Sequence, residues 1–325
     1  MSGNKKIKTG VVGTGYLGRF HAQKYAALEN SELIGVFDLD SEKCASVAAE
    51  TNSTPLSAYS ELFGKAEAVS IVTPTKTHHK VAKEFLERGI HVLLEKPMTV
   101  TLEEADDLIE TSNKSGAILQ IGHLERFNPA VLALKDRVTE PLFIEAHRLS
   151  QFSPRALDVD VVLDLMIHDI DIIMNFVKSE IESVEAAGIP VISGKVDIAN
   201  ARITFKNGCV ANITASRISK DRMRRTRIFQ RDTYIAIDYA TQKIELLALK
   251  RGTGPMPEIV EEKLDIEKGD SLLEEIKSFL NCVATKTAPL VGAKDGKRAL
   301  QVAALVQEKT EQSLQKAAGR LKTLS

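Results

Sequence analysis

IKTGVVGTGYLG, residues 7–18, runs from a short apolar segment directly into a glycine-rich turn of the form GxGxxG. The apolar segment is typical of a strand, and residues 17–28 carry apolar side chains at helical spacing. Strand, GxGxxG and helix in this order indicate a dinucleotide-binding βαβ unit. Its first glycines allow a tight turn and the close approach of a pyrophosphate, and the third lets the helix pack on the strand.

The same alternation of strand and helix continues to residue 122. Further apolar runs lie at residues 32–37, 68–72, 91–94 and 117–121, and helical patterns at 41–50, 78–88 and 102–115. Alternating strands and helices predict parallel βαβ units and therefore a doubly wound α/β sheet. We expect residues 1–122 to form an NAD-binding Rossmann domain.

Beyond Gly122 the predicted strands follow one another with turns between them. They lie at residues 141–152, 181–192, 196–205, 209–218, 225–230, 234–238 and 243–250, with helices at 129–137, 159–178, 270–284 and 297–318 and a loop at 251–257. Lys206-Asn207-Gly208 is a strong hairpin signal. Strands in succession indicate a mostly antiparallel sheet. We therefore expect residues 123–325 to form a separate α+β domain that binds the substrate.

The glycine-rich turn and the end of the second strand predict the cofactor. Five residues of the turn are candidate cofactor contacts, since backbone N–H groups at a helix N-terminus bind phosphate: Gly13, Gly15, Tyr16, Leu17 and Gly18. Asp38 lies twenty positions after Gly18, where a carboxylate accepts hydrogen bonds from the adenosine ribose and repels a 2′-phosphate. Leu39 follows without an arginine, which favours NAD over NADP.

Two more loops follow predicted strands, at the sheet edge where ligands bind in open α/β folds. They add six candidate cofactor contacts: Thr73, Pro74, Thr75, His78, Glu95 and Lys96. Lys96 precedes Pro97, and a residue before proline is held extended. Its side chain is therefore expected to be aimed at the site rather than freely solvated.

Asp164 and His168 are the candidate catalytic pair of the second domain. They lie one turn apart on the predicted helix at residues 159–178, which is apolar on nearly every side. Histidine has an ordinary pKa suited to taking a carbinol proton, and Lys96 can stabilise the alkoxide or share the proton. Asp164 would orient His168 or the substrate. Whether Lys96 or His168 is the base stays open, and the alternative is a histidine satisfied within the core.

Basic residues provide candidates for a sugar-nucleotide substrate, because the arginine fork suits phosphate. With Lys96, Asp164 and His168, the candidate substrate contacts are Arg126, Asn128, Arg148 and Arg155. The basic run at residues 220–227 is either a solvated strand or a diphosphate clamp. The histidines lack metal-ligand spacing, so no metal is expected.

Composition excludes several classes of function. The 43 basic and 44 acidic residues give a net charge of −1, which argues against a nucleic-acid-binding protein. No run of about 18 apolar residues predicts a membrane span, and the polar N-terminus lacks the apolar region of a signal peptide. Cys44, Cys209 and Cys282 show no CxxC spacing, which fits a reducing, cytoplasmic location.

The motifs together resemble one enzyme family over almost the whole chain. GVVGTGYLG at 10–18, Asp38, TPTKTHH at 73–79 and, most specifically, Glu95-Lys96-Pro97 are similar to the glucose–fructose oxidoreductase / inositol dehydrogenase / MocA (Gfo/Idh/MocA) family. The resemblance implies a Rossmann domain followed by a domain with a large open mixed sheet, and NAD(P)-dependent chemistry at a sugar or cyclitol carbon. It also implies that Lys96 is the active-site lysine before a cis proline, and that Asp164 and His168 are the Asp-x-x-x-His pair.

Three segments resemble the branch of this family that acts on UDP-N-acetylglucosamine: GHLERFNPAV at 122–131, HRLSQFSPR at 147–155 and DVVLDLMIHDID at 160–171. That branch oxidises the 3-hydroxyl carbon and hands a 3-keto sugar nucleotide to a partner aminotransferase. The alternatives are an inositol, polyol or free-sugar dehydrogenase, or a dinucleotide-binding regulator without catalysis. Family members assemble through the open sheet face, and an exposed flat face would be a large apolar patch, so we expect a homodimer or homotetramer.

Overall fold

The computed structural model describes residues 6–153, 159–250 and 257–323, which fall into two compact units. Unit 1 consists of Met1–Leu124 and Asp270–Arg298. Unit 2 consists of Glu125–Gly269 and Ala299–Ser325. The first boundary lies close to the expected one at residue 122. Residues 123–325 were expected to form one domain, but Asp270–Arg298 belongs to unit 1.

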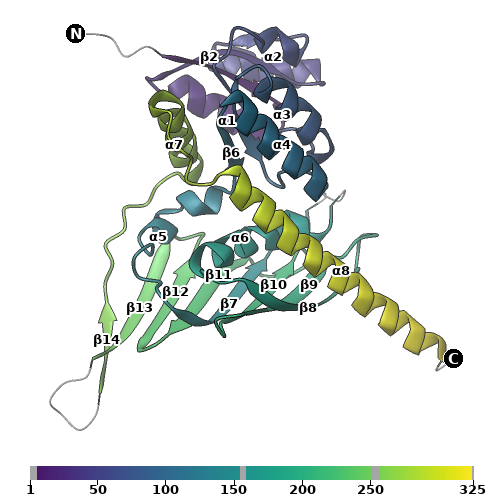
Figure 1. Ribbon diagram of the computed structural model, residues 1–325, viewed down its shortest axis with the longest axis vertical. Coiled ribbons are helices and arrows are strands. Elements are labelled where there is room, and N and C mark those ends of the chain that lie inside the picture. Colours follow the sequence, from purple (N-terminus) through teal and green to yellow (C-terminus); the bar gives the residue numbers. More distant parts are fainter. Residues whose placement is uncertain (1–5, 154–158, 251–256, 324–325) are drawn as a thin grey trace. The chain divides into compact units, whose positions relative to one another are not determined.

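Unit 1 is built on a six-stranded sheet in the order β3-β2-β1-β4-β5-β6 (Figure 1). Its strands are β1 (Ile7–Val12), β2 (Ser31–Phe37), β3 (Thr54–Pro55), β4 (Ala68–Ile71), β5 (His91–Glu95) and β6 (Leu119–Gly122). Every pairing is parallel. The strand order reverses between β1 and β4, and ligands of such sheets bind beyond the carboxyl ends of the strands at this point. The predicted doubly wound sheet is confirmed.

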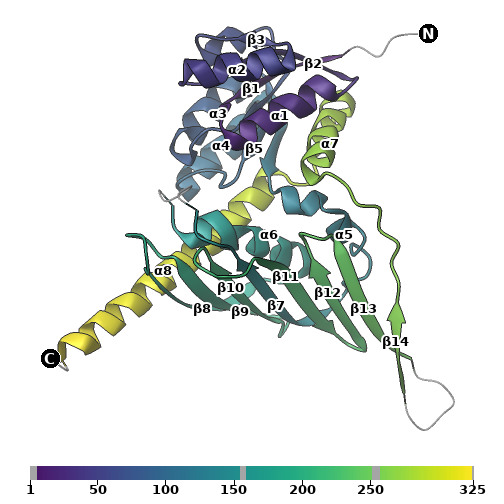
Figure 2. The ribbon, with the colours of Figure 1, turned by 180° about the vertical axis from the view of Figure 1, so that it is seen from behind.

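Helices cover both faces of this sheet (Figures 1 and 2). They are α1 (Tyr16–Ala27), α2 (Ser41–Thr51) and α7 (Ser271–Thr285) on one side, and α3 (His78–Leu86) and α4 (Leu102–Ser115) on the other. Local sequence defines several helix ends. The Asp40 side chain accepts from Lys43 N at the start of α2, and Thr101 with Glu104 forms a capping box on α4.

Helix α7 completes the core of unit 1 although it follows the second sheet in the chain. Four of its apolar side chains are buried with those of β1, β2 and α1: Leu272, Ile276, Phe279 and Leu280. The spacing of apolar residues predicts which face of a helix is buried, but not which of the two hydrophobic cores it packs against. The sequence therefore predicts the helix but not the unit to which it belongs.

Unit 2 is built on an eight-stranded sheet in the order β14-β13-β12-β11-β7-β10-β9-β8. Its strands are β7 (Pro141–Leu149), β8 (Ile181–Ile189), β9 (Ile198–Phe205), β10 (Val210–Ser216), β11 (Met223–Gln230), β12 (Thr233–Asp238), β13 (Lys243–Lys250) and β14 (Glu258–Glu262). All its pairings are antiparallel except that of β7 with β10. The expected mixed, mostly antiparallel sheet is confirmed.

Helical segments bury one face of this sheet. They are η3 (Leu124–Phe127), α5 (Pro129–Leu132), η4 (Val162–Met166), α6 (Ile167–Phe176) and α8 (Ala293–Thr323). Inward side chains of the strands, such as Ile144 and Ile213, share a core with residues of α6 and α8. The opposite face carries charged and polar side chains, among them Glu145, His147 and Arg202. The half-buried rings of Phe143, Phe229 and Tyr234 lie on the same face, so it is mixed rather than one continuous apolar patch.

Several element boundaries differ from the predicted ones. The predicted helix at 159–178 is a π-helical turn, η4, followed by α6. Strand β8 ends at Ile189 because Pro190 follows, and Asp197 then accepts hydrogen bonds from three successive N–H groups of residues 191–193. Strand β14 was not predicted. The predicted loop at 251–257 lies almost wholly outside the described residues.

The predicted hairpin at Lys206-Asn207-Gly208 is confirmed. It joins β9 to β10, whose residues Thr204 and Val210 are paired across the turn. Gly208 has a φ of 85°, and the Asn207 side chain accepts from Cys209 N at 3.1 Å. A left-handed glycine and an Asx bond at these two positions are what an Asn-Gly turn supplies.

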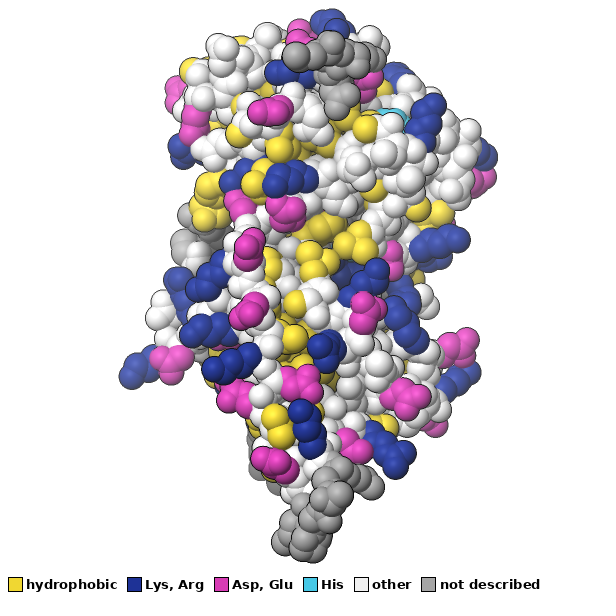
Figure 3. All heavy atoms as spheres, turned by 90° about the vertical axis from the view of Figure 1, so that its left-hand side faces the viewer, with side chains coloured by type: hydrophobic (Ala, Val, Ile, Leu, Met, Phe, Trp, Pro, Cys, Tyr) yellow, Lys and Arg dark blue, Asp and Glu magenta, His cyan; other side chains and the backbone are white. Residues whose placement is uncertain are grey.

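The described residues contain no candidate membrane span, and one face of the molecule shows both signs of charge. No described helix has both the length and the hydropathy needed to span a bilayer. Among the described residues, no group of three His, Cys, Asp or Glu side chains is arranged as a metal site. Basic and acidic side chains are interspersed on the face in Figure 3.

Replacing Phe279 tests the place of α7 in unit 1. Phe279→Ala removes a fully buried ring from that core and should lower the free energy of unfolding by about 3–5 kcal/mol. Urea titration followed by circular dichroism measures the loss. A matched change at the exposed Leu290, Leu290→Ala, should cost less than about 0.5 kcal/mol. Equal effects of the two changes would contradict the packing of α7.

Candidate active site

The glycine-rich turn has the geometry that the sequence predicts. Gly13 has a φ of 96°, and a Cβ there would lie 2.5 Å from the carbonyl oxygen of Val72. A Cβ on Gly18 would lie 1.8 Å from the carbonyl oxygen of Gly13. Side chains at these two positions would therefore break the turn or separate α1 from β1.

Gly15 differs from its neighbours because its missing side chain faces open space. A Cβ on Gly15 would meet no heavy atom within 4 Å. Gly15 is the N-cap of α1, and no side chain caps that end of the helix. N–H groups at a helix N-terminus bind anions well. This cradle fits a dinucleotide pyrophosphate, with Tyr16 and Leu17 next to it in the first turn of α1.

Asp38 connects the glycine-rich turn to the end of β2. Its Oδ2 accepts from Thr14 N at 2.6 Å and from Thr14 Oγ1 at 3.2 Å, and its Oδ1 accepts from Asp40 N at 2.9 Å. Leu39 beside it is 93% exposed. The carboxylate is therefore fixed by backbone N–H groups at the place where the sequence predicts the adenosine ribose.

His78 lies inside the protein rather than at its surface. The side chain is 1% exposed, with Nε2 at 2.8 Å from Thr73 O and Nδ1 at 2.9 Å from Pro97 O. Burial lowers the pKa of His78, although both backbone contacts act in the opposite direction. The side chain thus ties the loop after β4 to the loop after β5. Its predicted role as a cofactor contact becomes one of fixing the loops that carry Thr73, Pro74 and Thr75.

Glu95 and Lys96 lie where β5 ends, and the Lys96–Pro97 peptide is cis as the resemblance implies. Glu95 is buried, and its carboxylate contacts His21 Nε2 at 3.2 Å and accepts from Lys96 N at 3.2 Å. Lys96 is half-buried. The predicted cofactor residues of unit 1 thus come together at the carboxyl edge of one sheet, with the Glu95 side chain turned inward.

Asp164 and His168 lie on the helical segment that starts at Asp160. The Asp160 side chain accepts from the N–H groups of Val162 and Leu163, and it also accepts from Gln307. Asp164 belongs to the π-helical turn and His168 to the first turn of α6, and both are half-buried. Turns of π-helix are frequent at functional sites. The pair is therefore less enclosed than an all-apolar helix predicts.

The fully buried carboxylates of α6 are Asp169 and Asp171, which the sequence analysis did not single out. Arg148 of β7 donates through Nε and Nη2 to Asp169 at 2.8 and 3.0 Å, and through Nη1 to Glu125 at 3.0 Å. Arg148 is 3% exposed and lies over the Tyr239 ring. All three guanidinium nitrogens bond carboxylates within unit 2. This placement does not support the expectation that Arg148 holds a diphosphate.

The other predicted substrate contacts are equally enclosed or lie elsewhere. Arg126 is buried with Asp171 at 3.2 Å, and Asn128 caps α5 and donates to Tyr239 O. Arg155 lies outside the described residues. Arg126 and Asn128 therefore stabilise the interior of unit 2 in this structure.

Most of the basic run at 220–227 belongs to β11. A strand was one of the two alternatives that the sequence left open. Arg225 Nη2 donates to Glu245 at 2.8 Å, and Arg227 pairs with Glu145. Glu145 belongs to β7, which pairs with β11, and Glu245 belongs to β13, which is separated from β11 by β12. The solvated-strand interpretation is favoured over a diphosphate clamp.

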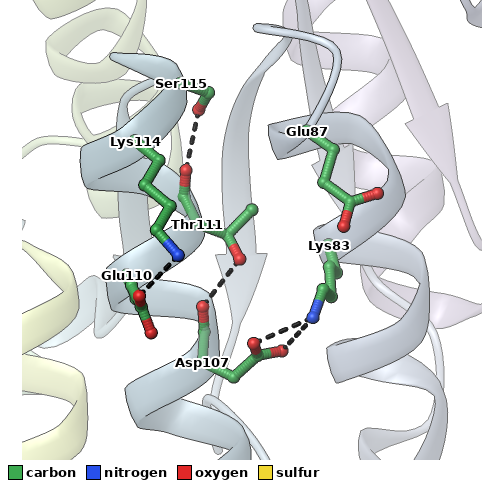
Figure 4. A pocket seen from close by; sticks show the side chains of 7 residues that line it. All are labelled: Lys83, Glu87, Asp107, Glu110, Thr111, Lys114 and Ser115. Atoms are coloured by element: carbon green, nitrogen blue, oxygen red, sulfur yellow. Dashed lines mark hydrogen bonds and ion pairs between the residues drawn. The ribbon is translucent and has the colours of Figure 1, made fainter.

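A surface depression between α3 and α4 carries only local ion pairs among the side chains that Figure 4 labels. Lys83 Nζ lies 2.8 Å from both carboxylate oxygens of Asp107, and Lys114 points to Glu110 (Figure 4). Exposed pairs of this kind contribute about 0–1 kcal/mol. The depression lies on the helices, away from the carboxyl edge of the sheet where the predicted cofactor residues gather.

Comparisons with known proteins agree with both units. The family model described as "Oxidoreductase family, NAD-binding Rossmann fold" matches residues 7–123, and the "GFO/IDH/MocA C-terminal domain" model matches residues 136–235. UDP-N-acetylglucosamine 3-dehydrogenase of Acidithiobacillus ferrooxidans is 41% identical over 95% of this chain and 99% of its own. A solved structure of that enzyme, with the same identity and coverage, superposes with a TM-score of 0.91.

More distant relatives act on other carbinols. The NAD(+)-dependent scyllo-inositol 2-dehydrogenase of Bacillus subtilis is 31% identical over 66% of this chain and 68% of its own. A levoglucosan dehydrogenase solved with NADH and levoglucosan has a TM-score of 0.84 at 18% identity and covers 95% of this chain and 98% of its own. At that identity the similarity shows the fold alone. The family model, for its part, describes residues 7–123 as an NAD-binding Rossmann fold.

Asp38→Ala should weaken NAD binding roughly tenfold and relax discrimination against NADP, because it removes the carboxylate that meets the ribose or repels a 2′-phosphate. Isothermal titration calorimetry with NAD and with NADP measures both affinities, since the chain has no tryptophan for a fluorescence assay. Asp40→Ala removes a neighbouring carboxylate that caps α2 and should leave the NAD to NADP ratio unchanged. Tighter binding of NADP than NAD by the unaltered protein would contradict the assignment.

Arg148→Met should destabilise the protein by about 3–5 kcal/mol, because it leaves Asp169 and Glu125 buried without their cation. Urea titration measures the loss. The exposed Arg231 provides a matched control, and Arg231→Met should cost less than about 0.5 kcal/mol. If Arg148→Met keeps full stability and instead raises the KM for a sugar nucleotide, the diphosphate role returns.

Proposed function

The chain belongs to the Gfo/Idh/MocA family of oxidoreductases, and from this premise we propose that it is an NAD-dependent UDP-N-acetylglucosamine 3-dehydrogenase. The observation that carries the proposal is the match to the Acidithiobacillus ferrooxidans enzyme, which runs through both units and almost the full length of both chains. Relatives that act on inositols match less of the chain and are less similar. The proposed reaction turns the 3-hydroxyl carbon of the sugar into a ketone.

NAD bound at the glycine-rich turn supplies the hydride acceptor. The N–H groups at the start of α1 would hold its pyrophosphate, and Asp38 would accept hydrogen bonds from its ribose. The remaining residues fix the loops around it. His78 joins the loop of Thr73 to the loop of Lys96 through its two backbone contacts.

Lys96, Asp164 and His168 are the proposed catalytic residues. Oxidation of a carbinol needs a group that removes the hydroxyl proton and a donor that stabilises the developing alkoxide. We assign these two tasks to Lys96 and His168, with Asp164 orienting the imidazole or the sugar. A bound NAD cation favours the neutral form of Lys96, which suits it to share the proton.

A second candidate function is an inositol or free-sugar dehydrogenase, favoured by the scyllo-inositol relative. The buried state of Arg148 also bears on this alternative, because it removes one predicted diphosphate ligand. A non-catalytic NAD-binding regulator is the third candidate. It has no use for a lysine held at the carboxyl edge of the sheet, so we rank it last.

The partners are also proposals. The 3-keto sugar nucleotide is a substrate for transamination, so we propose an aminotransferase as the next enzyme. We propose a homodimer or homotetramer that pairs the polar face of the unit 2 sheet, where charged side chains such as Glu145 and Arg202 are complementary in sign. Three free, buried cysteines fit a reducing compartment, so we place the enzyme in the cytoplasm.

An assay of NADH absorbance with a panel of substrates tests the function. UDP-N-acetylglucosamine should be oxidised with the highest kcat/KM, ahead of scyllo-inositol, myo-inositol, glucose and UDP-glucose. Mass spectrometry of the product should show loss of two hydrogen atoms. Turnover of inositols alone would favour the second candidate, and NAD binding without turnover of any substrate would favour the regulator.

Lys96→Met and His168→Ala should each lower kcat by roughly 10²–10⁴-fold with NAD affinity nearly unchanged, because positioned acid–base groups act on the transition state. Steady-state kinetics with the preferred substrate and NADH fluorescence titration measure the two quantities. The variant whose pH–kcat profile loses its acid limb identifies the base. Near-normal kcat in both variants would contradict the catalytic assignment.

A further inference from the structure

A chain of buried polar side chains lies next to Lys96 in unit 1. Tyr25 Oη lies 2.8 Å from Ser70 Oγ, Ser70 Oγ lies 3.1 Å from His21 Nδ1, and His21 Nε2 lies 3.2 Å from Glu95 Oε1. Glu95 Oε2 accepts from Lys96 N at 3.2 Å. His21 and Tyr25 come from α1, Ser70 from β4 and Glu95 from β5, so the chain joins the cofactor helix to the lysine loop.

One assignment of protons satisfies every member of this chain. Tyr25 donates to Ser70, Ser70 donates to His21 Nδ1, and His21 donates through Nε2 to the Glu95 carboxylate. In this arrangement His21 is neutral and Glu95 carries the negative charge. Glu95 then accepts two hydrogen bonds, one from a side chain and one from the backbone of Lys96.

A second carboxyl, that of Glu275 on α7, is buried in the same interior. It is 0% exposed, and neither of its oxygens has a hydrogen-bond partner among the described residues. The Gln120 side chain of β6 lies against it, since Gln120 Nε2 donates to the Glu275 backbone oxygen at 3.2 Å. Gln120 Oε1 is also buried without a partner. This part of the core therefore contains the Glu275 carboxyl and the Gln120 amide oxygen, neither of which receives a hydrogen bond from a described residue.

The two carboxyls cannot both be ionised in this interior. An ionised carboxylate without donors is strongly disfavoured when buried, and a second negative charge nearby adds to the cost. Burial raises the pKa of Glu275 well above its ordinary value, and the charge of Glu95 raises it further. The described groups that face Glu275 include no cation: they are Glu95 on β5, Gln120 on β6 and Tyr25 on α1.

We propose that the Glu95 carboxylate is a positioning group for Lys96 and that Glu275 is its neutral, protonated partner. The pair then carries one negative charge, held by Glu95 through His21 and the backbone of Lys96. Gly122 leaves room for the Glu95 carboxylate, since a Cβ at residue 122 would lie 2.8 Å from Glu95 Oε1. A proton on Glu275 is a donor for Gln120 Oε1, reached directly or through one internal water. The catalytic part of this proposal rests on the proposed role of Lys96.

The stability of the variant Glu275→Gln tests the protonation of Glu275. An unfolded glutamate ionises near pH 4.3, whereas folded Glu275 keeps its proton, so folding takes up a proton and stability falls as pH rises above about 5. Glutamine cannot ionise. From pH 5 to 8, the unfolding equilibrium constant of the unaltered protein should therefore rise relative to that of Glu275→Gln by up to about tenfold per pH unit.

Urea titrations of the full chain at pH 5, 6, 7 and 8 measure this ratio, with Glu110→Gln on exposed α4 as the matched control. The control ratio should stay constant with pH. A constant ratio for Glu275→Gln as well would show that Glu275 is ionised in the folded protein and would overturn the proposal.

The variant Glu95→Gln tests the positioning of Lys96. It should lower kcat by at least about tenfold while the affinity for NADH changes by less than about threefold, because cofactor contacts remain and the lysine loop loses its anchor. Loss of the negative charge should also move the limb of the pH–kcat profile that reports Lys96 to lower pH. A packing defect alone would not move that limb. A folded Glu95→Gln protein with unchanged kcat and pH profile would overturn the positioning role.

If Glu95→Gln does not fold, two variants of His21 test the positioning of Lys96 instead. His21→Gln retains an N–H donor toward Glu95, whereas His21→Leu does not, so His21→Gln should keep at least about fivefold more kcat. Equal kcat of the two would count against the chain. The stability test needs no substrate. Absence of turnover in the unaltered protein would thus refute the proposed function while the protonation of Glu275 is still decided.

Discussion

The close approach of α1 to β1 is the constraint on which unit 1 depends. The carbonyl oxygen of Gly13 occupies the space that a Gly18 side chain would need, and Gly13 itself adopts a φ open to glycine. The same approach starts α1 at Gly15, where no side chain caps the helix and a Cβ would meet no heavy atom within 4 Å. It also carries His21, one turn further along α1, to the carboxylate of Glu95. Backbone packing at two glycines therefore places both the phosphate cradle and the support of the lysine loop.

Much of this arrangement is readable from the sequence because it is local. The GxGxxG turn, the alternation of strand and helix and the Asn-Gly hairpin at residue 207 are each encoded within a few residues, and the structure confirms them. The position of Asp38 follows in the same way, since it depends only on where β2 ends. The cis peptide before Pro97 was expected from the family resemblance rather than from any local rule.

Features that depend on long-range pairing are not encoded locally in the sequence. Nothing within residues 270–298 states that α7 returns to unit 1, because its apolar face fits either core. Arg148 is more instructive, since a signal was present. Strand alternation places it on the same face as Ile144 and Ala146, both buried, which predicts an inward arginine. An inward arginine needs buried acids, and Asp169 and Asp171 on the apolar helix α6 were the available ones.

The two units bury carboxylates by different means, and the difference follows from what lies beside them. In unit 2, one guanidinium, that of Arg148, donates hydrogen bonds to both Asp169 and Glu125, which suits a cluster whose task is stability. An arginine next to Glu95 would cancel the negative charge of the carboxylate that anchors the lysine loop. If Glu275 were ionised as well, its carboxylate would be buried without a cation or a hydrogen-bond donor among the described residues. A proton on Glu275 avoids both outcomes, because it neutralises one acid without adding a cation and leaves the charge of Glu95 to act on the lysine loop.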